Sequence, residues 1–539
     1  MALGFGAGTV AALSRLPDRD AVDSNLEVLG QVQTPEVGES GESGESGNGP
    51  ETIQATERPA EPTTSTTTEP AEPTGPPREF QTVITGGRVV DPETGVDQIA
   101  NVGISNGTIA AITEGPVIGT EETIDASGLV VSPGFIDILS YEPNEFGIWF
   151  KVADGVTSNM AMHGVNARAA SFVTRWEGRS PVNYGGAFDN PYMRSTLFGE
   201  LNIGVEQPAN QTQIDQMVEW AEEDLSSGFV GIDFEPEYSP GVEFAEMVAL
   251  ARVAEAKGMA CYFHARYSDP DPPGTNAEAI DEIINVAKET GVAVHVEHLS
   301  STGGTHTMAQ SLATIASARD QGYDVTACIY PYTFWATTVA STRFATGWQD
   351  RFRISHGDLK VAGRPDIVVT EQNFRSLSAE FGLDNPLVAA MDTIPAEEIA
   401  LALDAPFVMM GSDGILEAVA SGLPPQNHPR GAGTFARTLG HYVRDTGTIG
   451  LLPALAKMTI LPARRLESGA PAFARKGRLQ EGMDADITIF DADTINDRAT
   501  IDNPGQESIG IDWVLVDGQI IRQPGSTERP TNGKAITSA

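Results

Sequence analysis

Two histidines follow apolar runs that are typical of consecutive strands. His264 follows MACYF, and His298 follows VAVHVE. A lone histidine at a strand end is more often a hydrogen-bonded structural residue. Two neutral imidazoles about one strand apart, however, suit a divalent metal ion. We therefore predict that His264 and His298 are metal ligands.

The alternation of side chains along a strand predicts which residues accompany His298. Val294, Val296 and His298 fall on one face of the run, whereas His295 and Glu297 fall on the other. If the two valines face the interior of the fold, His298 ends the inward row. His295 is then expected to be a packing residue.

Asp413 ends another apolar run, PFVMMGSDG. An aspartate in this position either caps the next helix or acts as a general base. Beside a metal it would remove a proton from the attacking water and return it to the leaving amine. We favour the second role and predict that Asp413 is catalytic.

A glycine-rich stretch after Asp413, NHPRGAGTFARTLG, contains His428 and Arg430. Loop arginines are usually solvated surface charges, but beside a hydrolytic site a guanidinium group can hold a substrate carboxylate. We predict that Arg430 and His428 bind substrate, together with Tyr330 and Tyr332 at the end of a further apolar run.

The spacing of these residues indicates the elements that position them. The polar strand ends lie 298−264 = 34 and 330−298 = 32 residues apart, with an amphipathic helix between each pair. This is the spacing of βα units, and the chemistry of a barrel lies at the carboxyl ends of its strands. We predict an α/β fold with a (β/α)8 TIM-type barrel over residues 133–475, although an open doubly wound sheet would have a similar spacing.

Short strands with turn signals occur at both ends of the ordered chain. Gly86-Gly87 and Asn106-Gly107 mark turns in the first set, and Asp517-Gly518 marks a hairpin in the second. We predict that residues 80–132 and 476–525 together form a small β-sandwich domain.

The chain begins and ends with segments that we expect to lie outside the core. Residues 1–17 are apolar and resemble part of an export signal, so both an exported and a cytoplasmic protein remain open. Residues 18–79, rich in Glu, Ser, Thr, Pro and Gly, predict a disordered acidic tether, and residues 526–539 predict a disordered tail.

Composition limits the possible partners. The 34 Lys and Arg against 74 Asp and Glu give a net charge of −40, which argues against nucleic acid as a partner. The acidic excess fits either adaptation to high salt or an ordinary acidic protein. No apolar run approaches the roughly 20 residues that span a bilayer. Cys261 and Cys328 are expected to be buried thiols, with one disulfide as the alternative, and the oligomeric state is left open.

The order of several motifs resembles the amidohydrolase superfamily and, within it, the N-acyl-D-amino-acid deacylase (D-aminoacylase) family. The resemblance covers roughly residues 80–522 and rests on VVSPGFID at 130–137, GVT at 155–157, DLSSGF at 224–229, the strands ending in His264 and His298, YPY at 330–332, SDG at 412–414, HPRGAGTFAR at 428–437, and KMTILPARRL and RKGRLQEGMDADITIFD near the end. It implies a (β/α)8 barrel with a β-sandwich, and zinc-dependent hydrolysis of an N-acyl bond. It also implies Asp413 as the acid/base and Arg430 on the substrate carboxylate.

The chain departs from this family at the metal site. Leu139 and Tyr141 stand where the superfamily has a His-x-His pair. The family's bridging cysteine falls near Gly164, where the preceding His163 could substitute if the strand end is irregular. Ser300 and Cys328 replace a lysine and an aspartate of the family. We therefore predict one zinc ion per chain, bound by His264 and His298 with His163 as the candidate third ligand.

Three functions follow from these residues. The first is a metal-dependent amidohydrolase that cleaves the N-acyl bond of an N-acyl (D-)amino acid or a related small amide. The second is a catalytically impaired protein of the same fold with a binding or scaffolding role. The third is an amidohydrolase of another substrate class, such as a cyclic amide.

Overall fold

The computed structural model describes residues 78–538 except 200–204, 273, 384 and 420–422. The predicted export segment and nearly all of the predicted tether lie outside the described residues. Arg78 and Glu79, at the end of that tether prediction, already belong to the first strand. None of the helices in the described ranges is both long enough and apolar enough to cross a bilayer. Cys261 and Cys328 are buried free thiols, as expected.

Strands from both ends of the chain pair in one eight-stranded sheet. Its order is β20-β19-β18-β5-β1-β2-β3, with β4 paired to β1. The strands are β1 (Arg78–Asp91), β2 (Val96–Ser105), β3 (Thr108–Thr113), β4 (Val117–Asp125), β5 (Val130–Pro133), β18 (Ile487–Phe490), β19 (Ile511–Val516) and β20 (Gln519–Arg522). The pairing of β5 with β18 therefore joins the strands from the two ends of the chain.

Two of the three predicted turns in this sheet are confirmed. Asn106 and Gly107 connect β2 to β3, and Asp517 and Gly518 connect β19 to β20, all four with positive φ as such tight hairpins require. The prediction at Gly86 is wrong. That residue, at φ 68°, shifts the register of β1 against β2, and the strand continues through it.

The centre of the chain alternates parallel strands with helices, which confirms the α/β class. The strands form a three-stranded sheet, β6-β7-β8, and a six-stranded sheet, β17-β13-β12-β11-β10-β9, so their pairing does not close into one continuous barrel. They are β6 (Phe135–Tyr141), β7 (Val156–His163), β8 (Asn183–Gly186), β9 (Phe188–Asp189), β10 (Gly231–Phe234), β11 (Ala260–Phe263), β12 (Ala293–Val296), β13 (Val325–Ile329) and β17 (Val408–Met410).

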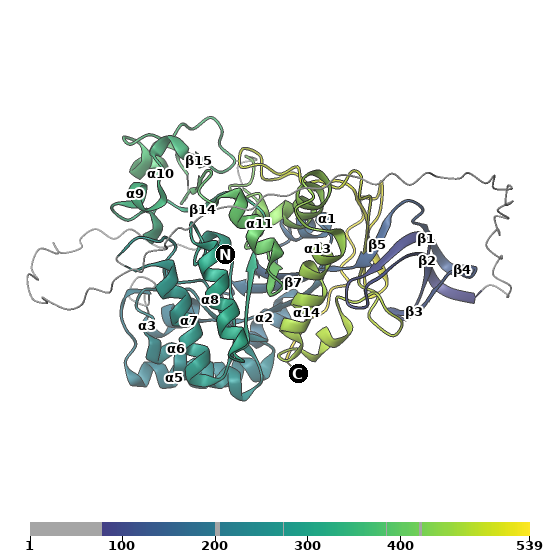
Figure 1. The fold of residues 1–539 in the computed structure, drawn as a ribbon, viewed down its shortest axis with the longest axis horizontal. Helices are drawn as coiled ribbons and strands as arrows, with labels where there is room; N and C mark the ends of the chain where they lie inside the picture. The colour runs from purple at the N-terminus through teal and green to yellow at the C-terminus, as the bar shows by residue number, and fades with distance from the viewer. Residues whose placement is uncertain (1–77, 200–204, 273, 384, 420–422, 539) are drawn as a thin grey trace, which may run out of the picture. The chain divides into compact units, whose positions relative to one another are not determined.

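Helices α5, α6, α7 and α8 pack side by side in that order along the six-stranded sheet (Figure 1). The helices described are α1 (Ile148–Ala153), α2 (Ala169–Trp176), α3 (Asn190–Phe198), α5 (Gln211–Ser227), α6 (Phe244–Ala256), α7 (Asn276–Thr290), α8 (Met308–Asp320), α9 (Trp348–Phe352), α10 (Leu377–Phe381), α11 (Ala396–Asp404), α12 (Arg430–Arg437), α13 (Leu451–Met458) and α14 (Ile460–Glu467), with a π-helix at Thr438–Asp445 after α12.

Helix α7 shows how the sequence sets such an element. Thr275 and Glu278 form a reciprocal capping box at its start, and Gly291 ends it at φ 79°. The apolar residues predicted to share one face are all buried: Ile280, Ile283, Ile284 and Ala287. This face packs in one apolar cluster with Val294 and Val296 of the next strand.

The two valines of β12 therefore face the helices, and the predicted orientation of this strand is wrong. Its other face carries His295, which lies beside the ring of Tyr262 and within 2.8 Å of Thr326 Oγ1. Tyr262 belongs to a second apolar cluster with Cys328 and Met409, residues of the neighbouring strands. Glu297 thus continues the inner row, because it follows His295 at a spacing of two.

Two further features were not predicted. A small antiparallel sheet, β14-β16-β15, lies between β13 and β17 in sequence: β14 (Trp335–Thr338), β15 (Leu359–Val361) and β16 (Leu387–Ala390). The expected disordered tail also differs from the structure. Residues 526–538 are described, Ile536 is buried, and its backbone N–H donates to the carbonyl of Tyr184 in β8.

Candidate metal centre

Three imidazoles converge at the carboxyl ends of parallel strands. His163 ends β7, His264 follows β11 and His298 follows β12. His163 Nε2 lies 3.4 Å from His298 Nε2, and the rings of His264 and His298 are 4.5 Å apart. All three side chains are at most 4% exposed. The structure thus brings together the three residues predicted as ligands, with nitrogen atoms near enough to share one ion.

The strand irregularity that His163 required is present. Tyr141 pairs with His163 and Ser140 with Ala161, so β7 has one more residue than β6 at this end. Gly164 follows at φ 65°, and a Cβ there would meet the Tyr141 ring at 2.8 Å. The bulge therefore directs His163 toward the site, because the extra residue reverses the alternation.

Leu139 and Tyr141 lie where a His-x-His pair would add further ligands. Leu139 is fully buried in the apolar cluster of the inner sheet face. The Tyr141 ring lies 5.8 Å from the His163 ring, and burial raises the pKa of its phenol well above the usual value. At neutral pH, the uncharged phenol of Tyr141 therefore borders the site, and Leu139 offers no ligand atom.

Four carboxylates surround the imidazoles, and sequence reasoning missed them all. Asp233 Oδ2 lies 3.1 Å from His163 Nδ1, with Glu235 Oε1 at 3.6 Å. Glu297 Oε2 lies 3.3 Å from His163 Nε2, and Glu237 Oε2 lies 2.6 Å from His264 Nε2. The signal was present in IDFEPE, which places three acids at alternate positions, Asp233 within the buried strand β10 and Glu235 and Glu237 directly after it.

The surroundings set the charge of each imidazole. Burial lowers the pKa of His298 well below its usual value, and burial also lowers that of His264, so both are neutral at pH 7. Burial alone would lower the pKa of His163 too, but Glu297, Asp233 and Glu235 outweigh it and raise that pKa well above 6.5. Without a metal, His163 is the cation of the cluster. A metal ion would displace its proton.

The donor set fits a zinc-like ion. Ligand atoms held 2.0–2.1 Å from a tetrahedral zinc lie roughly 3.3–3.4 Å apart, which matches the distances from His163 Nε2 to His298 Nε2 and Glu297 Oε2. Among the described residues, both Glu297 oxygens, Asp233 Oδ1 and His298 Nδ1 are buried without a hydrogen-bond partner. Buried polar atoms are rarely left in this state, so they point to a missing partner.

Two arginines pair with acids at the edge of the site. Arg430 donates from Nη2 to Asp413 Oδ2 at 2.8 Å and from Nε to the Asp413 carbonyl at 2.7 Å. Arg343 pairs with Glu237, and the Glu237 carboxylate in turn contacts His264 Nε2. Because His264 Nε2 is engaged by Glu237, Nδ1 is the ring nitrogen that stays free of this contact.

Asp413 and His298 share an unusual backbone conformation. Asp413 has φ 48° and His298 has φ 26°, both in the left-handed region that few residues other than glycine adopt. Asp413 N donates to the Leu139 carbonyl at 2.8 Å, which holds its turn beside β6. The two side chains meet with Oδ2 3.9 Å from His298 Nε2. Such strain is typical of functional sites.

The residues predicted to bind substrate divide into two groups. Tyr330 lies beneath the Arg430 guanidinium, 4.5 Å from its ring centroid, at the edge of the site. His428 instead uses both ring nitrogens on backbone groups, the Phe334 carbonyl and the Arg430 N–H. Tyr332 donates to Asp497. His428 and Tyr332 are thus held in supporting contacts around the arginine.

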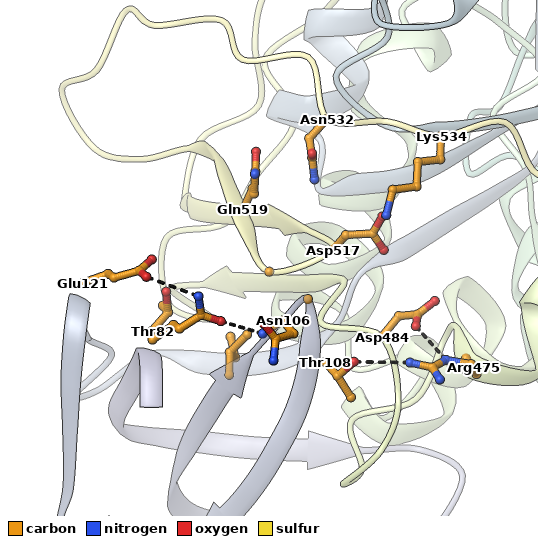
Figure 2. Close-up of a pocket in the computed structure, with 14 residues that line it drawn as sticks. Thr82, Asn106, Thr108, Glu121, Arg475, Asp484, Asp517, Gln519, Asn532 and Lys534 are labelled. Atoms are coloured by element: carbon orange, nitrogen blue, oxygen red, sulfur yellow. Dashed lines mark hydrogen bonds and ion pairs between the residues drawn. The ribbon is translucent and has the colours of Figure 1, made fainter. Parts of the chain in front are cut away.

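The structure also contains a pocket away from this site. It measures about 500 Å³ and lies at the eight-stranded sheet (Figure 2). Its charged groups pair with one another, Lys534 with Asp517 at 2.6 Å and Arg475 with Asp484 at 2.8 Å. None of its lining residues belongs to the imidazole cluster, so this pocket is separate from the candidate metal centre.

Comparisons with known proteins identify the family of this chain. The Amidohydrolase family model (Amidohydro_3) matches residues 194–522. An N-acyl-D-glutamate deacylase of Alcaligenes xylosoxydans xylosoxydans is 33% identical, over 83% of this chain and 95% of the relative, and a D-aminoacylase of that organism is 27% identical, over 82% and 95%. The crystal structure of an N-acyl-D-glutamate deacylase from Bordetella bronchiseptica, complexed with zinc and a phosphonate inhibitor that mimics the reaction's tetrahedral intermediate, superposes with a TM-score of 0.70 at 26% identity, over 85% of this chain and all of that one.

Proposed function

Because the chain belongs to the amidohydrolase family, we propose that it is a metal-dependent hydrolase that cleaves the N-acyl amide bond of an N-acyl-D-amino acid. One observation carries the proposal: three buried imidazoles converge on one point, with Asp413 3.9 Å from His298. The similarity to deacylases over most of the chain supports this substrate class.

The fold in this proposal is a (β/α)8 barrel that spans residues 133–475, joined to a small β-sandwich domain of residues 80–132 and 476–525. The two parallel sheets would be arcs of the barrel. One residue separates β8 from β9, and beyond β17 the N–H of Asp413 donates to Leu139 of β6. The β8–β9 connection and the Asp413–Leu139 hydrogen bond lie at the two places where the three-stranded and six-stranded sheets would meet to close the barrel.

The cofactor in this proposal is one zinc ion per chain, held by His163, His264 and His298. When bound, the ion would polarise the acyl carbonyl and lower the pKa of water toward neutrality. The protein's part is to orient the ligands: Asp233 contacts His163 and Glu237 contacts His264. Such carboxylate partners fix the tautomer and direction of a ligating histidine.

Asp413 is the proposed acid/base. Its carboxylate accepts a proton from the attacking water and returns it to the leaving amine. Arg430 holds Asp413 in place through two contacts, from Nη2 to the carboxylate and from Nε to the backbone carbonyl. The same guanidinium group is proposed to bind the substrate carboxylate, with Tyr330 below it and with His428 and Tyr332 supporting the loop.

The substrate is a small amide with a free carboxylate. The test is metal analysis of the purified full chain beside turnover of N-acetyl-D-glutamate, N-acetyl-D-leucine and their L-enantiomers. We expect about one zinc per chain and a preference for the D-enantiomers. A zinc content below about 0.2 ions per chain after loading, with no turnover of any of these substrates, would contradict the proposal.

A further inference from the structure

We propose that Glu297 is a fourth metal ligand in this chain and that Asp233 is the residue that positions His163 for the same ion. The inference rests on the proposed function, because it concerns the ligands of the proposed metal. It assigns the site a donor set of three nitrogens and one oxygen, in place of a site completed by a His-x-His pair at positions 139 and 141, where this chain has Leu139 and Tyr141.

The position of Glu297 is the first observation. The residue directly follows β12, at the carboxyl end where the imidazoles meet, and it is fully buried. Its Oε2 lies 3.3 Å from His163 Nε2, almost the same distance as His298 Nε2 from that atom. Each of these two distances from His163 Nε2 has the length of an edge of a tetrahedral zinc shell.

The lack of other partners is the second observation. Within the described ranges, no backbone, Lys or Arg donor hydrogen-bonds either Glu297 oxygen, and its polar contacts are with two members of the same cluster, the His163 ring and the Asp233 carboxylate. A structural glutamate in a core would be expected to accept hydrogen bonds from backbone or side-chain donors. Both oxygens instead remain available to a cation.

The charges around the site give the third observation. Asp413 pairs with Arg430 and Glu237 pairs with Arg343, so each of these acids has a permanent cation. Glu297 and Asp233 have no Lys or Arg in ion-pair range among the described residues. Both carboxylates share the single ring of His163 as their partner, and burying more carboxylates than cations is costly, because buried charges are normally paired or coordinate a metal. A divalent cation would supply the missing charge.

Asp233 has a different role because of the nitrogen that it contacts. Its Oδ2 lies 3.1 Å from His163 Nδ1, on the ring edge opposite Nε2. An N–H donated to Asp233 leaves the lone pair on Nε2, which faces Glu297 and His298. This is the arrangement in which a carboxylate orients a ligating imidazole.

The experiment measures zinc affinity of the full chain after the metal is stripped with a chelator. A fluorescent chelator competes for Zn²⁺ with the parent and with Glu297→Gln, Glu297→Asp, Asp233→Asn and His298→Ala. Glu398→Gln is the matched control, because that buried glutamate bonds the backbone N–H groups of His306 and Met308, outside the cluster. Circular dichroism of the metal-free proteins checks that each variant folds.

We expect Glu297→Gln to weaken zinc binding by more than about 100-fold, and Asp233→Asn by roughly 10–100-fold, as a positioning residue does. Glu297→Asp keeps the charge and should fall between the parent and Glu297→Gln. Co²⁺ absorption should change shape in Glu297→Gln, because a ligand is lost, and should keep its shape in Asp233→Asn. Glu398→Gln should match the parent.

Two outcomes separate this inference from the proposed function. If His298→Ala loses zinc while Glu297→Gln keeps parental affinity and the parental Co²⁺ spectrum, Glu297 is not a ligand and only this inference fails. If the parent itself binds no zinc, the proposed function fails with it.

Discussion

At the scale of single residues, Asp413 is the group whose replacement separates proton transfer from metal binding. In Asp413→Asn, the amide cannot accept the proton of the attacking water, whereas the three imidazoles are unchanged. We expect kcat for the best N-acetyl-D-amino acid to fall about 10²–10⁴-fold, with zinc content as in the parent. Steady-state kinetics and elemental analysis of the same preparation check both parts. A kcat within twofold of the parent would remove Asp413 from the mechanism.

The histidines of the candidate metal centre were predicted from the sequence, whereas the carboxylates around them were not. Of the three histidines that lie together, His264 and His298 were predicted from two strand ends and His163 from an offset that needed a bulge. Glu297 was assigned to the face opposite His298, because strand alternation was extended past Val296, where β12 ends. Beyond that point His298 adopts φ 26°, so adjacent side chains can reach one site. A local backbone turn at a non-glycine residue has no residue pattern in the sequence that would predict it.

At the scale of elements, a buried ion pair ties three segments together beneath Asp413. Lys151 of α1 lies 2.7 Å from Asp137 of β6 and also contacts Ser412, whose N–H donates to Asp137 at 2.9 Å. Lys151→Met leaves the Asp137 carboxylate buried without its cation. We expect this variant to lower the free energy of unfolding by about 3–5 kcal/mol, measured by urea denaturation.

The control for that variant is Lys360→Met. Lys360 pairs with Asp502 at 3.5 Å, and both side chains are nearly half exposed. Pairs of this kind contribute about 0–1 kcal/mol, so this variant should differ little from the parent. A loss in Lys151→Met no larger than in the control would show that the buried pair does not hold these segments.

The elements themselves were predicted unevenly. The βα units from β11 to β13 were found because each strand is a short apolar run and each helix has a regular apolar face. The sheet of β14, β15 and β16 was missed because its strands, as short as β11 and β12, belong to an insertion in which the intervening helices α9 and α10 have only five residues and show no regular apolar face. Short strands with few alternations carry too little signal to be distinguished from loops.

At the scale of the whole molecule, the last residues stabilise the centre of the chain from a distance in sequence. Gly533 N donates to the Ser180 carbonyl, and Tyr184 N donates to the Lys534 carbonyl, so this segment runs beside β8. Ile536 is 2% exposed and packs in the same apolar cluster as Met160 and Ala187, on the inner face of the sheets. Composition alone predicted a disordered tail here, because one buried isoleucine among polar residues gives no periodic pattern.

The contribution of this terminal segment is tested by Ile536→Ala. Truncating a buried isoleucine removes apolar contacts and leaves a cavity, so we expect the free energy of unfolding to fall by about 2–5 kcal/mol. Ile99→Ala is the matched control: the same substitution at a side chain that is 62% exposed should change it by less than about 0.5 kcal/mol. Urea denaturation of both variants gives the comparison. Equal stability of the two would mean that the segment packs without stabilising the core, whereas the expected difference would make the chain's end part of the structure that supports the metal centre.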